Sequence, residues 1–326
     1  MIELKDLKEV HTNEETALLD MGDGIGCLQF RSKGNSISAS VREFIVEMLA
    51  HDLYEFDGVV IASQNKHFSV GANLVNMKTN IDNKNFTAME ENVRSFQSMT
   101  AGIKYSKKPI VAAPYRMTLG GGLEVVLHCS ARVALEKSYM GLVETGVGLL
   151  PGGGGTKCTA MLLNGLTGQA LEETMVRLFD KLIFAKVSKN AEDARTLMYL
   201  QPEDGIVSAE EELISTAKDK CLELLRSGYQ PAAAPETAVL PGKEGYDLLM
   251  RHSEALRQEG KITAYDFEIG KKIALILAGS STEGPRSYTE QEILARERQC
   301  FVELTQSEGT YQRIDHFLRT NEKLRN

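Results

Sequence analysis

The sequence has little that would suit a secreted, membrane-spanning or nucleic-acid-binding protein. Its five cysteines include no C-x-x-C pair, which argues against zinc and thioredoxin-like sites. An odd cysteine count, in a 326-residue chain whose opening is too charged for a signal peptide, favours a reducing, cytoplasmic setting. No apolar run is long enough for a membrane helix. The net charge of −8 disfavours nonspecific binding to nucleic acid or anionic membranes.

Nucleotide-binding and metal-binding motifs are also missing. Residues 152–157, GGGGTK, have the wrong order for a P-loop. A dinucleotide fingerprint lies between a strand and a helix, whereas residues 22–27 lead into a strand. Residues 146–151 lack the third glycine of this fingerprint. Neither His67 nor His128 has a second histidine or a carboxylate at ligand spacing, so no metal site is expected.

What the first half does contain is an alternation of strand and helix patterns. The predicted strands cover residues 25–30, 56–63, 109–114 and 131–135. Helices are predicted over residues 40–53, where Ser40 and Glu43 suggest a capping box, and over residues 86–100. This order favours an α/β fold with a sheet covered by helices.

The second half is mostly helical. Ser208 and Glu211 are expected to cap a helix that runs to about residue 228. Residues 230–242 are rich in proline and alanine and predict a linker or an extended crossing segment. Four more helices are predicted over about residues 244–259, 263–279, 288–304 and 308–323.

A run of three glycines opens one of the helical stretches. Residues 118–129 read TLGGGLEVVLHC, and Glu124 lies in the first turn after the glycines. A helix N-terminus carries unpaired N–H groups and partial positive charge, and glycine lets a substrate atom approach the backbone there. This arrangement suits an oxyanion hole for a carbonyl oxygen. A tight strand-to-helix crossing with a favourably placed glutamate fits the motif equally well.

Two further stretches favour catalysis. Glu144 is the only charged residue in residues 138–155, and apolar surroundings are expected to raise its pKa, so that it can hold or deliver a proton. The alternative is a solvated loop glutamate. Residues 63–74, SQNKHFSVGANL, end in the small-residue turn Gly71-Ala72, which can supply a second N–H to the hole.

Together these stretches resemble the crotonase (enoyl-CoA hydratase/isomerase) superfamily. HFSVGANL is similar to the first oxyanion segment of the family, commonly F-x-x-G-A-D-L, and residues 108–134 resemble the second, with its hydratase-type glutamate. Residues 139–156 resemble the segment that carries the second glutamate. Residues 32–38 resemble an early K-x-N-A-L stretch, and residues 185–207 a later S-A-x-E-A helix and turn.

The resemblance implies a role for each matching residue. Ala72 and Gly121 would donate backbone N–H groups to a thioester carbonyl, and Glu124 and Glu144 would flank the C2–C3 bond of the substrate. The residues implied in substrate binding are Lys33, Ser36, Lys66, Gly71, Gly120 and Gly152. No metal and no cofactor are implied, because CoA is part of the substrate; NAD would enter only with an attached dehydrogenase domain.

Some residues depart from the family pattern. Asn73 stands where aspartate is usual, and its side chain is expected to be structural. Leu142 and Val143 replace the usual Q-P before Glu144, which changes the expected acyl pocket and the placement of Glu144.

The resemblance implies a fold with a crotonase-like ββα spiral core and a helical C-terminal region. The predicted domains are residues 1–207, a core with an N-terminal connector, and residues 208–326. The long C-terminal part is more typical of the hydratase part of a bifunctional 3-hydroxyacyl-CoA dehydrogenase/enoyl-CoA hydratase of β-oxidation. An acyl-CoA thioester substrate, a homo-oligomer and an N-terminal dehydrogenase domain are the implied partners.

Other functions stay open at this point. Within the family, the chain would be an isomerase of 3-enoyl and 2-enoyl thioesters, a dehydratase or an acyl-CoA hydrolase. From another class, it would be a non-catalytic acyl-CoA-binding module. The presence of both Glu124 and Glu144 favours hydration over these alternatives.

Overall fold

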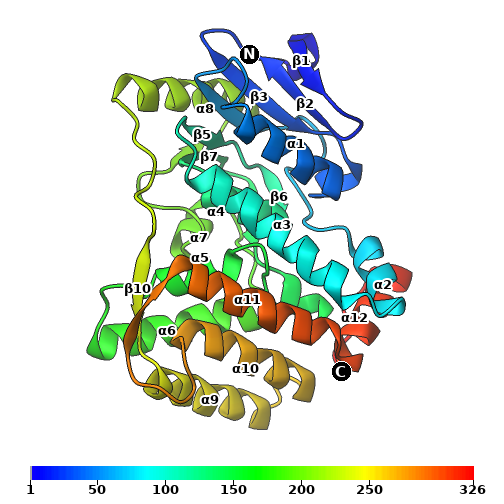
Figure 1. Ribbon diagram of the computed structural model, residues 1–326, viewed down its shortest axis with the longest axis vertical. Coiled ribbons are helices and arrows are strands. Elements are labelled where there is room, and N and C mark those ends of the chain that lie inside the picture. The colour runs from blue at the N-terminus through cyan, green and yellow to red at the C-terminus, as the bar shows by residue number, and fades with distance from the viewer. Residues whose placement is uncertain (1) are drawn as a thin grey trace. The chain divides into compact units, whose positions relative to one another are not determined.

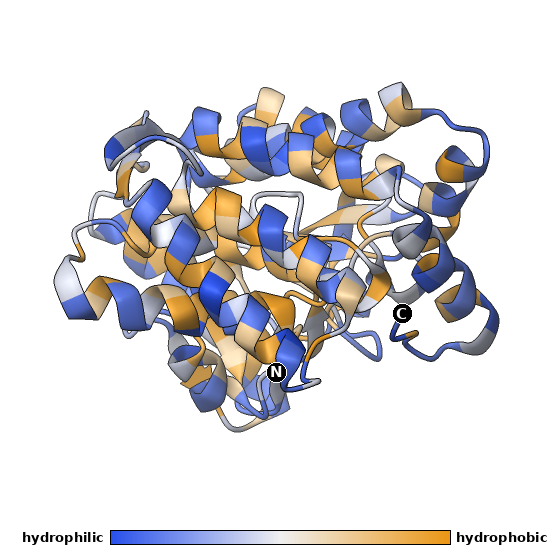
Figure 2. Ribbon diagram, turned by 90° about the horizontal axis from the view of Figure 1, so that it is seen from below, coloured by the Kyte–Doolittle hydropathy of each residue, from blue (hydrophilic) through white to orange (hydrophobic). Residues whose placement is uncertain are grey.

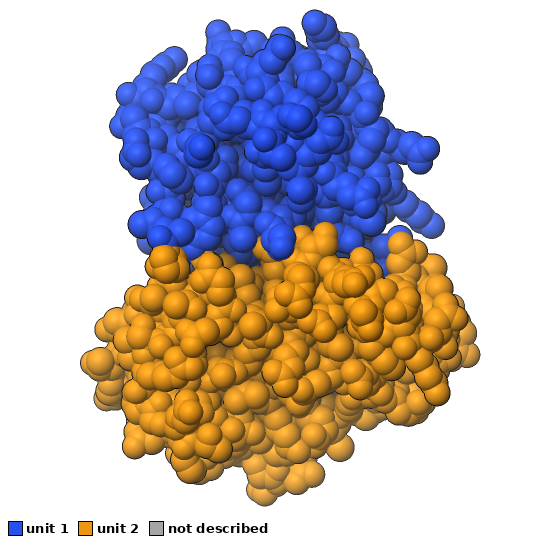
Figure 3. Space-filling view, in the orientation of Figure 1, with its two compact units in different colours: residues 1–73, 98–141, 187–234 blue, residues 74–97, 142–186, 235–326 orange. Residues whose placement is uncertain are grey.

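The computed structural model describes residues 2–326, which form two compact units (Figure 3). Unit 1 comprises the described residues up to 73 together with residues 98–141 and 187–234. Unit 2 comprises residues 74–97, 142–186 and 235–326. The division into domains at residue 207 stays a prediction, and the two units are described separately below.

Unit 1 is built around a seven-stranded sheet with the order β1-β2-β3-β4-β5-β7-β9. Its strands are β1 (Lys8–Thr12), β2 (Thr16–Asp20), β3 (Ile25–Phe30), β4 (Gly58–Ala62), β5 (Ile110–Ala112), β7 (Ala131–Leu135) and β9 (Gly205–Val207). The first three strands pair antiparallel and the rest pair parallel. β4, β5 and β7 are buried along their whole length, as strands covered on both faces are.

Helices cover this sheet. α1 (Ala39–Ala50) contacts β2, and α8 (Glu210–Arg226) contacts β3, β4, β5, β7 and β9 (Figure 1). The remaining helical elements of unit 1 are η1 (Leu4–Asp6), η2 (Lys33–Asn35), α4 (Gly121–His128), α7 (Ala191–Thr196) and the end of α3 (Phe86–Lys104). A second, parallel sheet joins β6 (Arg116–Leu119) to β8 (Ser138–Gly141) and leads directly into α4.

Unit 2 is mainly helical. Its elements are α2 (Leu74–Asp82), the start of α3, η3 (Glu144–Val147), α5 (Gly155–Met161), α6 (Gly168–Ile183), β10 (Thr237–Leu240), α9 (Lys243–Gln258), α10 (Ala264–Ala278), β11 (Arg286–Thr289), α11 (Glu290–Thr305) and α12 (Glu308–Thr320). α10 lies at the centre and contacts α5, α6, α9 and α11. Polar and apolar residues alternate along single helices, as amphipathic packing requires (Figure 2).

The sequence predicts most of these elements and misses others. All four strands predicted in the first half and all four helices predicted after residue 243 are present. The charged opening is not a plain connector, because β1 and β2 pair into the sheet. Part of the predicted linker forms β10, which pairs with β11.

Two predicted caps are wrong. α1 is capped by Ser38, whose hydroxyl accepts from the Val41 N–H at 3.2 Å, so the helix begins two residues earlier than the Ser40 box requires. α8 begins after Ala209, and no side chain caps it, so Ser208 does not have the predicted role. Ser38 and Ser40 both stand where the helical pattern of α1 begins, and the sequence pattern does not show which of the two caps the helix.

Residues 2–326 have neither a membrane-spanning helix nor a metal-binding cluster. Each helix of this part of the chain is too short or too polar to span a bilayer. Within the same residues, no group of three or more histidine, cysteine or acidic side chains is arranged to hold a metal ion.

Candidate active site

The glycine run forms the mouth of α4 in unit 1. Gly120 precedes the helix with φ 52° and ψ −130°, a conformation that residues with a side chain rarely adopt. Its N–H donates to the Gly141 carbonyl at 2.8 Å, which ties the helix mouth to the end of β8. Gly121 is the first residue of α4, so its N–H has no partner within the helix.

The Gly71-Ala72 turn lies against this helix mouth. The Leu119 N–H donates to the Ser69 carbonyl at 3.0 Å, and the Ser69 N–H donates to the Met117 carbonyl at 3.2 Å. A Cβ atom at Gly71 would lie 3.1 Å from the Leu119 carbonyl oxygen and 3.4 Å from the Gly121 nitrogen. Unit 1 therefore brings together the two backbone segments from which the sequence predicts an oxyanion hole.

Glu124 lies in the first turn of α4 and is only 3% exposed. The partial positive charge of the helix N-terminus favours a carboxylate at this position. One turn later, the His128 Nδ1 lies 2.6 Å from the Glu124 carbonyl oxygen. A carbonyl only accepts, so Nδ1 carries the proton, and His128 is a packed histidine within the helix.

Substitution of Gly71 tests the helix-mouth arrangement. Gly71→Ala is expected to lower kcat/KM roughly 100-fold, because the new methyl group would press on the backbone around the Gly121 N–H. Gly22→Ala is the matched control, because Gly22 also has a positive φ, 75° against 97° for Gly71. A Cβ atom added at Gly22 would have only the Lys218 Nζ within 4 Å among the described residues, at 3.9 Å. Steady-state kinetics with an enoyl-CoA measure both variants. Equal losses of kcat/KM in the two variants would mean that the loss comes from backbone strain and not from a disturbed oxyanion hole.

Glu144 belongs to unit 2, where it begins the short helix η3. Its Oε2 atom is buried and has no hydrogen-bond partner among the described residues. Burial raises the pKa of this carboxyl, and the nearby Glu297 carboxylate raises it further. Glu144 is therefore a carboxyl that favours its protonated form and has one oxygen without a partner, as a general acid requires.

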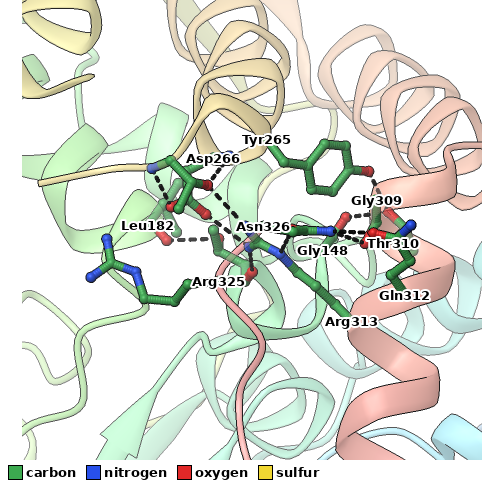
Figure 4. Close-up of polar contacts among 12 residues, drawn as sticks. Gly148, Leu182, Tyr265, Asp266, Gly309, Thr310, Gln312, Arg313, Arg325 and Asn326 are labelled. Carbon is green, nitrogen blue, oxygen red and sulfur yellow. Dashed lines mark hydrogen bonds and ion pairs between the residues drawn. The ribbon is translucent and has the colours of Figure 1, made fainter. Parts of the chain in front are cut away.

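The backbone that carries Glu144 is held by α10, α12 and the end of α6. The Arg313 guanidinium donates to the Thr145 carbonyl at 2.9 Å and forms an ion pair with Asp266 at 2.8 Å. The Thr145 hydroxyl donates to the Leu182 carbonyl at 2.8 Å, and the Thr310 hydroxyl donates to the Gly148 carbonyl at 2.5 Å. Figure 4 shows these groups converging on one network that also includes Asn326.

The implied substrate-binding residues fall into two groups. In unit 1, Lys33 and Lys66 are exposed and Ser36 is half-buried. The nearby Asn35 is buried and donates to the Ser63 hydroxyl at 3.0 Å and to the His67 carbonyl at 2.9 Å. In unit 2, Gly152 is buried, and a Cβ atom there would lie 2.5 Å from the Phe301 ring. The substrate-binding roles stay predictions.

Two residues near Glu144 were not found from the sequence. Arg313 lies on α12 and is 2% exposed, and Glu297 lies on α11 and is fully buried. Glu297 follows Ile293 by four residues and precedes Phe301 by four, so it occupies a position on the apolar stripe of its helix. A charged residue at such a position is the signal by which the sequence indicates a buried polar role.

Comparisons with known proteins give the family. The enoyl-CoA hydratase/isomerase family model matches residues 25–202, which is more than half of the chain. The chain is 36% identical over 330 aligned residues to a probable 3-hydroxyacyl-CoA dehydrogenase of Bacillus subtilis. That alignment covers 100% of this chain and 41% of the relative, so the chain spans less than half of that protein. A probable enoyl-CoA hydratase of the same organism is 32% identical over 133 residues, 38% of this chain and 47% of that one.

Solved structures give the fold. The crystal structure of an enoyl-CoA hydratase from Bacillus halodurans superposes with a TM-score of 0.62 at 16% identity, over 93% of this chain and 99% of that one. An enoyl-CoA hydratase/isomerase from Mycobacterium paratuberculosis gives a TM-score of 0.61 at 14% identity, over 94% and 99% of the two chains. The chain belongs to the enoyl-CoA hydratase/isomerase family and has the crotonase fold that its sequence motifs predict.

Proposed function

We propose that this chain is an enoyl-CoA hydratase, which adds water across the C2=C3 bond of a 2-enoyl-CoA. The observation that carries the proposal is the presence of two carboxyl groups in different surroundings. Glu124 is buried in the first turn of α4, where the partial positive charge of the helix N-terminus acts on its carboxyl group. Glu144 has a raised pKa and a buried oxygen without a partner among residues 2–326, which favours the protonated acid.

The backbone of unit 1 has the groups that the first step needs. The thioester oxygen would accept from the N–H groups of Ala72 and Gly121, the two segments that approach each other at Gly71. When water attacks C3, negative charge develops on this oxygen as the enolate forms. Donors already fixed in place stabilise that charge without reorganising, which lowers the barrier.

The two glutamates would supply the proton transfers. Glu124 accepts one proton of the attacking water, whose oxygen bonds to C3. Glu144 delivers its proton to C2, and the enolate collapses back to the thioester. The proton held by Glu124 then returns through solvent to Glu144. The net change is the addition of one water molecule, with no redox cofactor.

We also propose that the chain acts as the hydratase part of a bifunctional β-oxidation protein. The Bacillus subtilis relative that matches the whole chain is named as a probable 3-hydroxyacyl-CoA dehydrogenase and is more than twice as long as the matched part. Hydration of a 2-enoyl-CoA yields a 3-hydroxyacyl-CoA, which is the substrate of such a dehydrogenase. The two reactions therefore follow each other chemically. A homo-oligomer stays a prediction.

Turnover of defined thioesters tests the proposed function. Wild-type protein is incubated with crotonyl-CoA and with a longer 2-enoyl-CoA, and loss of the enoyl-thioester ultraviolet absorbance is followed. Mass spectrometry in ¹⁸O-water is expected to place one labelled oxygen on the acyl chain. Release of free CoA thiol would instead indicate a hydrolase. CoA binding without turnover of any enoyl-CoA would indicate a binding module.

Isomerisation is the second candidate, because moving a proton between C4 and C2 needs one acid–base carboxyl, and Glu144 has the surroundings for it. Glu124→Gln separates the two reactions. We expect it to lower hydration of a 2-enoyl-CoA by about 100-fold or more, because water is no longer activated. Conversion of a 3-enoyl-CoA to the 2-enoyl isomer is expected to fall much less. If the rates of hydration and isomerisation fall equally, Glu124 does not act specifically by activating the attacking water.

A further inference from the structure

The loop around η2 holds the two residues that precede Ala72. The Val70 N–H donates to the Gly34 carbonyl at 3.1 Å, and the Ile37 N–H donates to the Gly71 carbonyl at 3.0 Å. A Cβ atom at Gly34 would lie 2.9 Å from the Val70 Cγ2 atom, so the two stretches of chain pack closely. The segment that carries the Ala72 N–H is therefore bonded both to this loop and to β6.

Asn35 fixes the conformation of this loop. Its φ of 53° and the φ of 66° at Gly34 both lie in the left-handed region, which asparagine tolerates better than most residues with a side chain. Its amide nitrogen donates to the Ser63 hydroxyl and to the His67 carbonyl, and its amide oxygen accepts from the Asn65 side chain at 2.8 Å. Because a carbonyl only accepts, the bond to His67 determines which way the amide faces.

Asn35 thereby holds the stretch of chain that leads to the turn. The Tyr115 hydroxyl donates to the Asn65 carbonyl at 2.7 Å and to the His67 carbonyl at 3.2 Å. The His67 carbonyl thus accepts from two side chains, and both Asn35 and Tyr115 are at most 2% exposed. Since His67 lies only five residues before Ala72, its fixed carbonyl limits how far the Ala72 N–H can move.

We propose that Asn35 is a positioning residue for the oxyanion hole. Its side chain fixes residues 63–67, and its neighbours in the loop fix Val70 and Gly71, so that the Ala72 N–H is in place before the substrate binds. A donor fixed in advance stabilises the developing enolate charge without reorganising. This inference rests on the proposed function, because it takes the Ala72 N–H as one of the two donors to the thioester oxygen.

The other interpretation is that Asn35 only stabilises the fold, as a buried amide with three hydrogen bonds does anywhere. Asn35→Gly separates the two roles, because glycine adopts a φ of 53° without strain and only the side chain is lost. Asn13→Gly is the matched control. The Asn13 amide donates to the Ser40 carbonyl at 3.1 Å and hydroxyl at 3.0 Å, and it accepts from the Glu15 N–H at 2.9 Å. The same set of bonds, two donated and one accepted, is therefore lost outside residues 63–72.

Three properties are measured in the wild type and in each variant. The first is the carbonyl stretch of bound butyryl-CoA labelled with ¹³C at the thioester carbon, recorded as an infrared difference against the unlabelled compound. Butyryl-CoA has no double bond between C2 and C3, so it binds without being hydrated. The second property is kcat and KM for hydration of crotonyl-CoA. The third is the midpoint of thermal unfolding.

In the wild type we expect the bound thioester to absorb at a lower frequency than free butyryl-CoA, because hydrogen bonds from the hole weaken the C=O bond. Asn35→Gly is expected to lose most of this shift and to lower kcat roughly 100-fold with little change in KM, because the hole acts mainly in the transition state. Asn13→Gly should lower the unfolding midpoint and leave the stretch and kcat at their wild-type values. If Asn35→Gly also changes only the unfolding midpoint, Asn35 is purely structural and the proposal is overturned.

Asn35→Asp keeps the test decisive if Asn35→Gly does not fold. Aspartate has nearly the same size and tolerates the left-handed region, and its carboxylate can still accept from the Asn65 amide. It cannot donate to the His67 carbonyl. We expect the same direction of change, with most of the stretch shift lost and kcat about 10-fold lower. Wild-type values of both would show that the bond to His67 does not position the hole, and would overturn the proposal.

The infrared measurement and the hydration assay distinguish the failure of this inference from that of the proposed function. If the wild type hydrates no enoyl-CoA but its shifted stretch is lost in the Asn35 variants, hydration is rejected and the positioning role stands. If the wild type hydrates crotonyl-CoA and the Asn35 variants keep both the rate and the shift, the positioning role is rejected and hydration stands. If bound butyryl-CoA has no shifted stretch in the wild type, no hole polarises the thioester, and the positioning role is rejected whatever the hydration assay gives.

Discussion

Glu144→Gln is expected to lower kcat/KM for hydration of crotonyl-CoA by about 1000-fold, because a general acid contributes roughly that much to a rate. Glutamine has nearly the shape of a protonated glutamate, so substrate binding should change little and the loss should appear in kcat. The measurement is the decrease in enoyl-thioester absorbance over a range of substrate concentrations. Glu172→Gln, an exposed glutamate on α6 in the same unit, is the control and should retain the wild-type rate.

The pH dependence of stability checks the same residue without substrate. A carboxyl with a raised pKa in the folded state contributes stability that is fully present below its unfolded pKa, near 4.5, and is lost as pH rises through the folded pKa. Wild-type protein should therefore lose stability over that window. Glu144→Gln should lose less, because the amide does not ionise. An equal slope in both proteins would mean that Glu144 titrates normally and is not held as an acid.

The sequence predicts the backbone turns and central strands of unit 1 well because the constraint there is local. The Gly71-Ala72 turn and the glycine run at residues 120–122 need backbone conformations that glycine adopts, and such requirements leave a direct trace in the sequence. The central strands β4, β5 and β7 are recognisable for a similar reason. They are buried throughout, so they are short unbroken apolar runs.

The surroundings of Glu144 are not predictable in this way, because they depend on residues far along the chain. Glu297, which accepts from the Lys157 N–H, lies 140 residues beyond it, and Arg313 lies 168 residues beyond Thr145. Helical periodicity correctly predicts α11 and α12 as helices. It does not show which buried side chain of these helices forms a hydrogen bond with which backbone carbonyl or N–H group. The prediction that apolar surroundings raise the pKa of Glu144 is confirmed. The contribution of the Glu297 carboxylate to this shift could be recognised only from the structure.

The C-terminal helices have a specific structural role in unit 2. The sequence predicts them as helices but does not predict their contacts with the segment that carries Glu144. In the structure, α10 supplies Asp266, α11 supplies Glu297 and α12 supplies Arg313, and each of these charged residues is at most 9% exposed. Glu297 and Arg313 bond directly to the backbone between residues 145 and 157, and Asp266 forms an ion pair with Arg313. The segment of unit 2 that carries Glu144 is thus held by the region after residue 235.

Arg313→Met is expected to destabilise the protein by about 3–5 kcal/mol, because it leaves the buried carboxylate of Asp266 without its ion-pair partner. It also removes the donors to the Thr145 carbonyl, the Thr263 hydroxyl and the Asn326 side chain. Methionine retains much of the aliphatic volume of arginine, so the loss reports on the charge and the hydrogen bonds more than on packing. Chemical denaturation at pH 7 measures the change.

Arg319→Met on the same helix is the control, since Arg319 is exposed and, within residues 2–326, forms an ion pair only with Asp315, four residues away. Such a surface pair contributes about 0–1 kcal/mol. The double variant Asp266→Leu with Arg313→Met should recover part of the lost stability, because no unpaired charge then remains buried. Hydration should not recover with it, because the Thr145 carbonyl still lacks its donor and the Glu144 turn is no longer held. Recovery of both stability and activity would show that Arg313 acts only by neutralising Asp266.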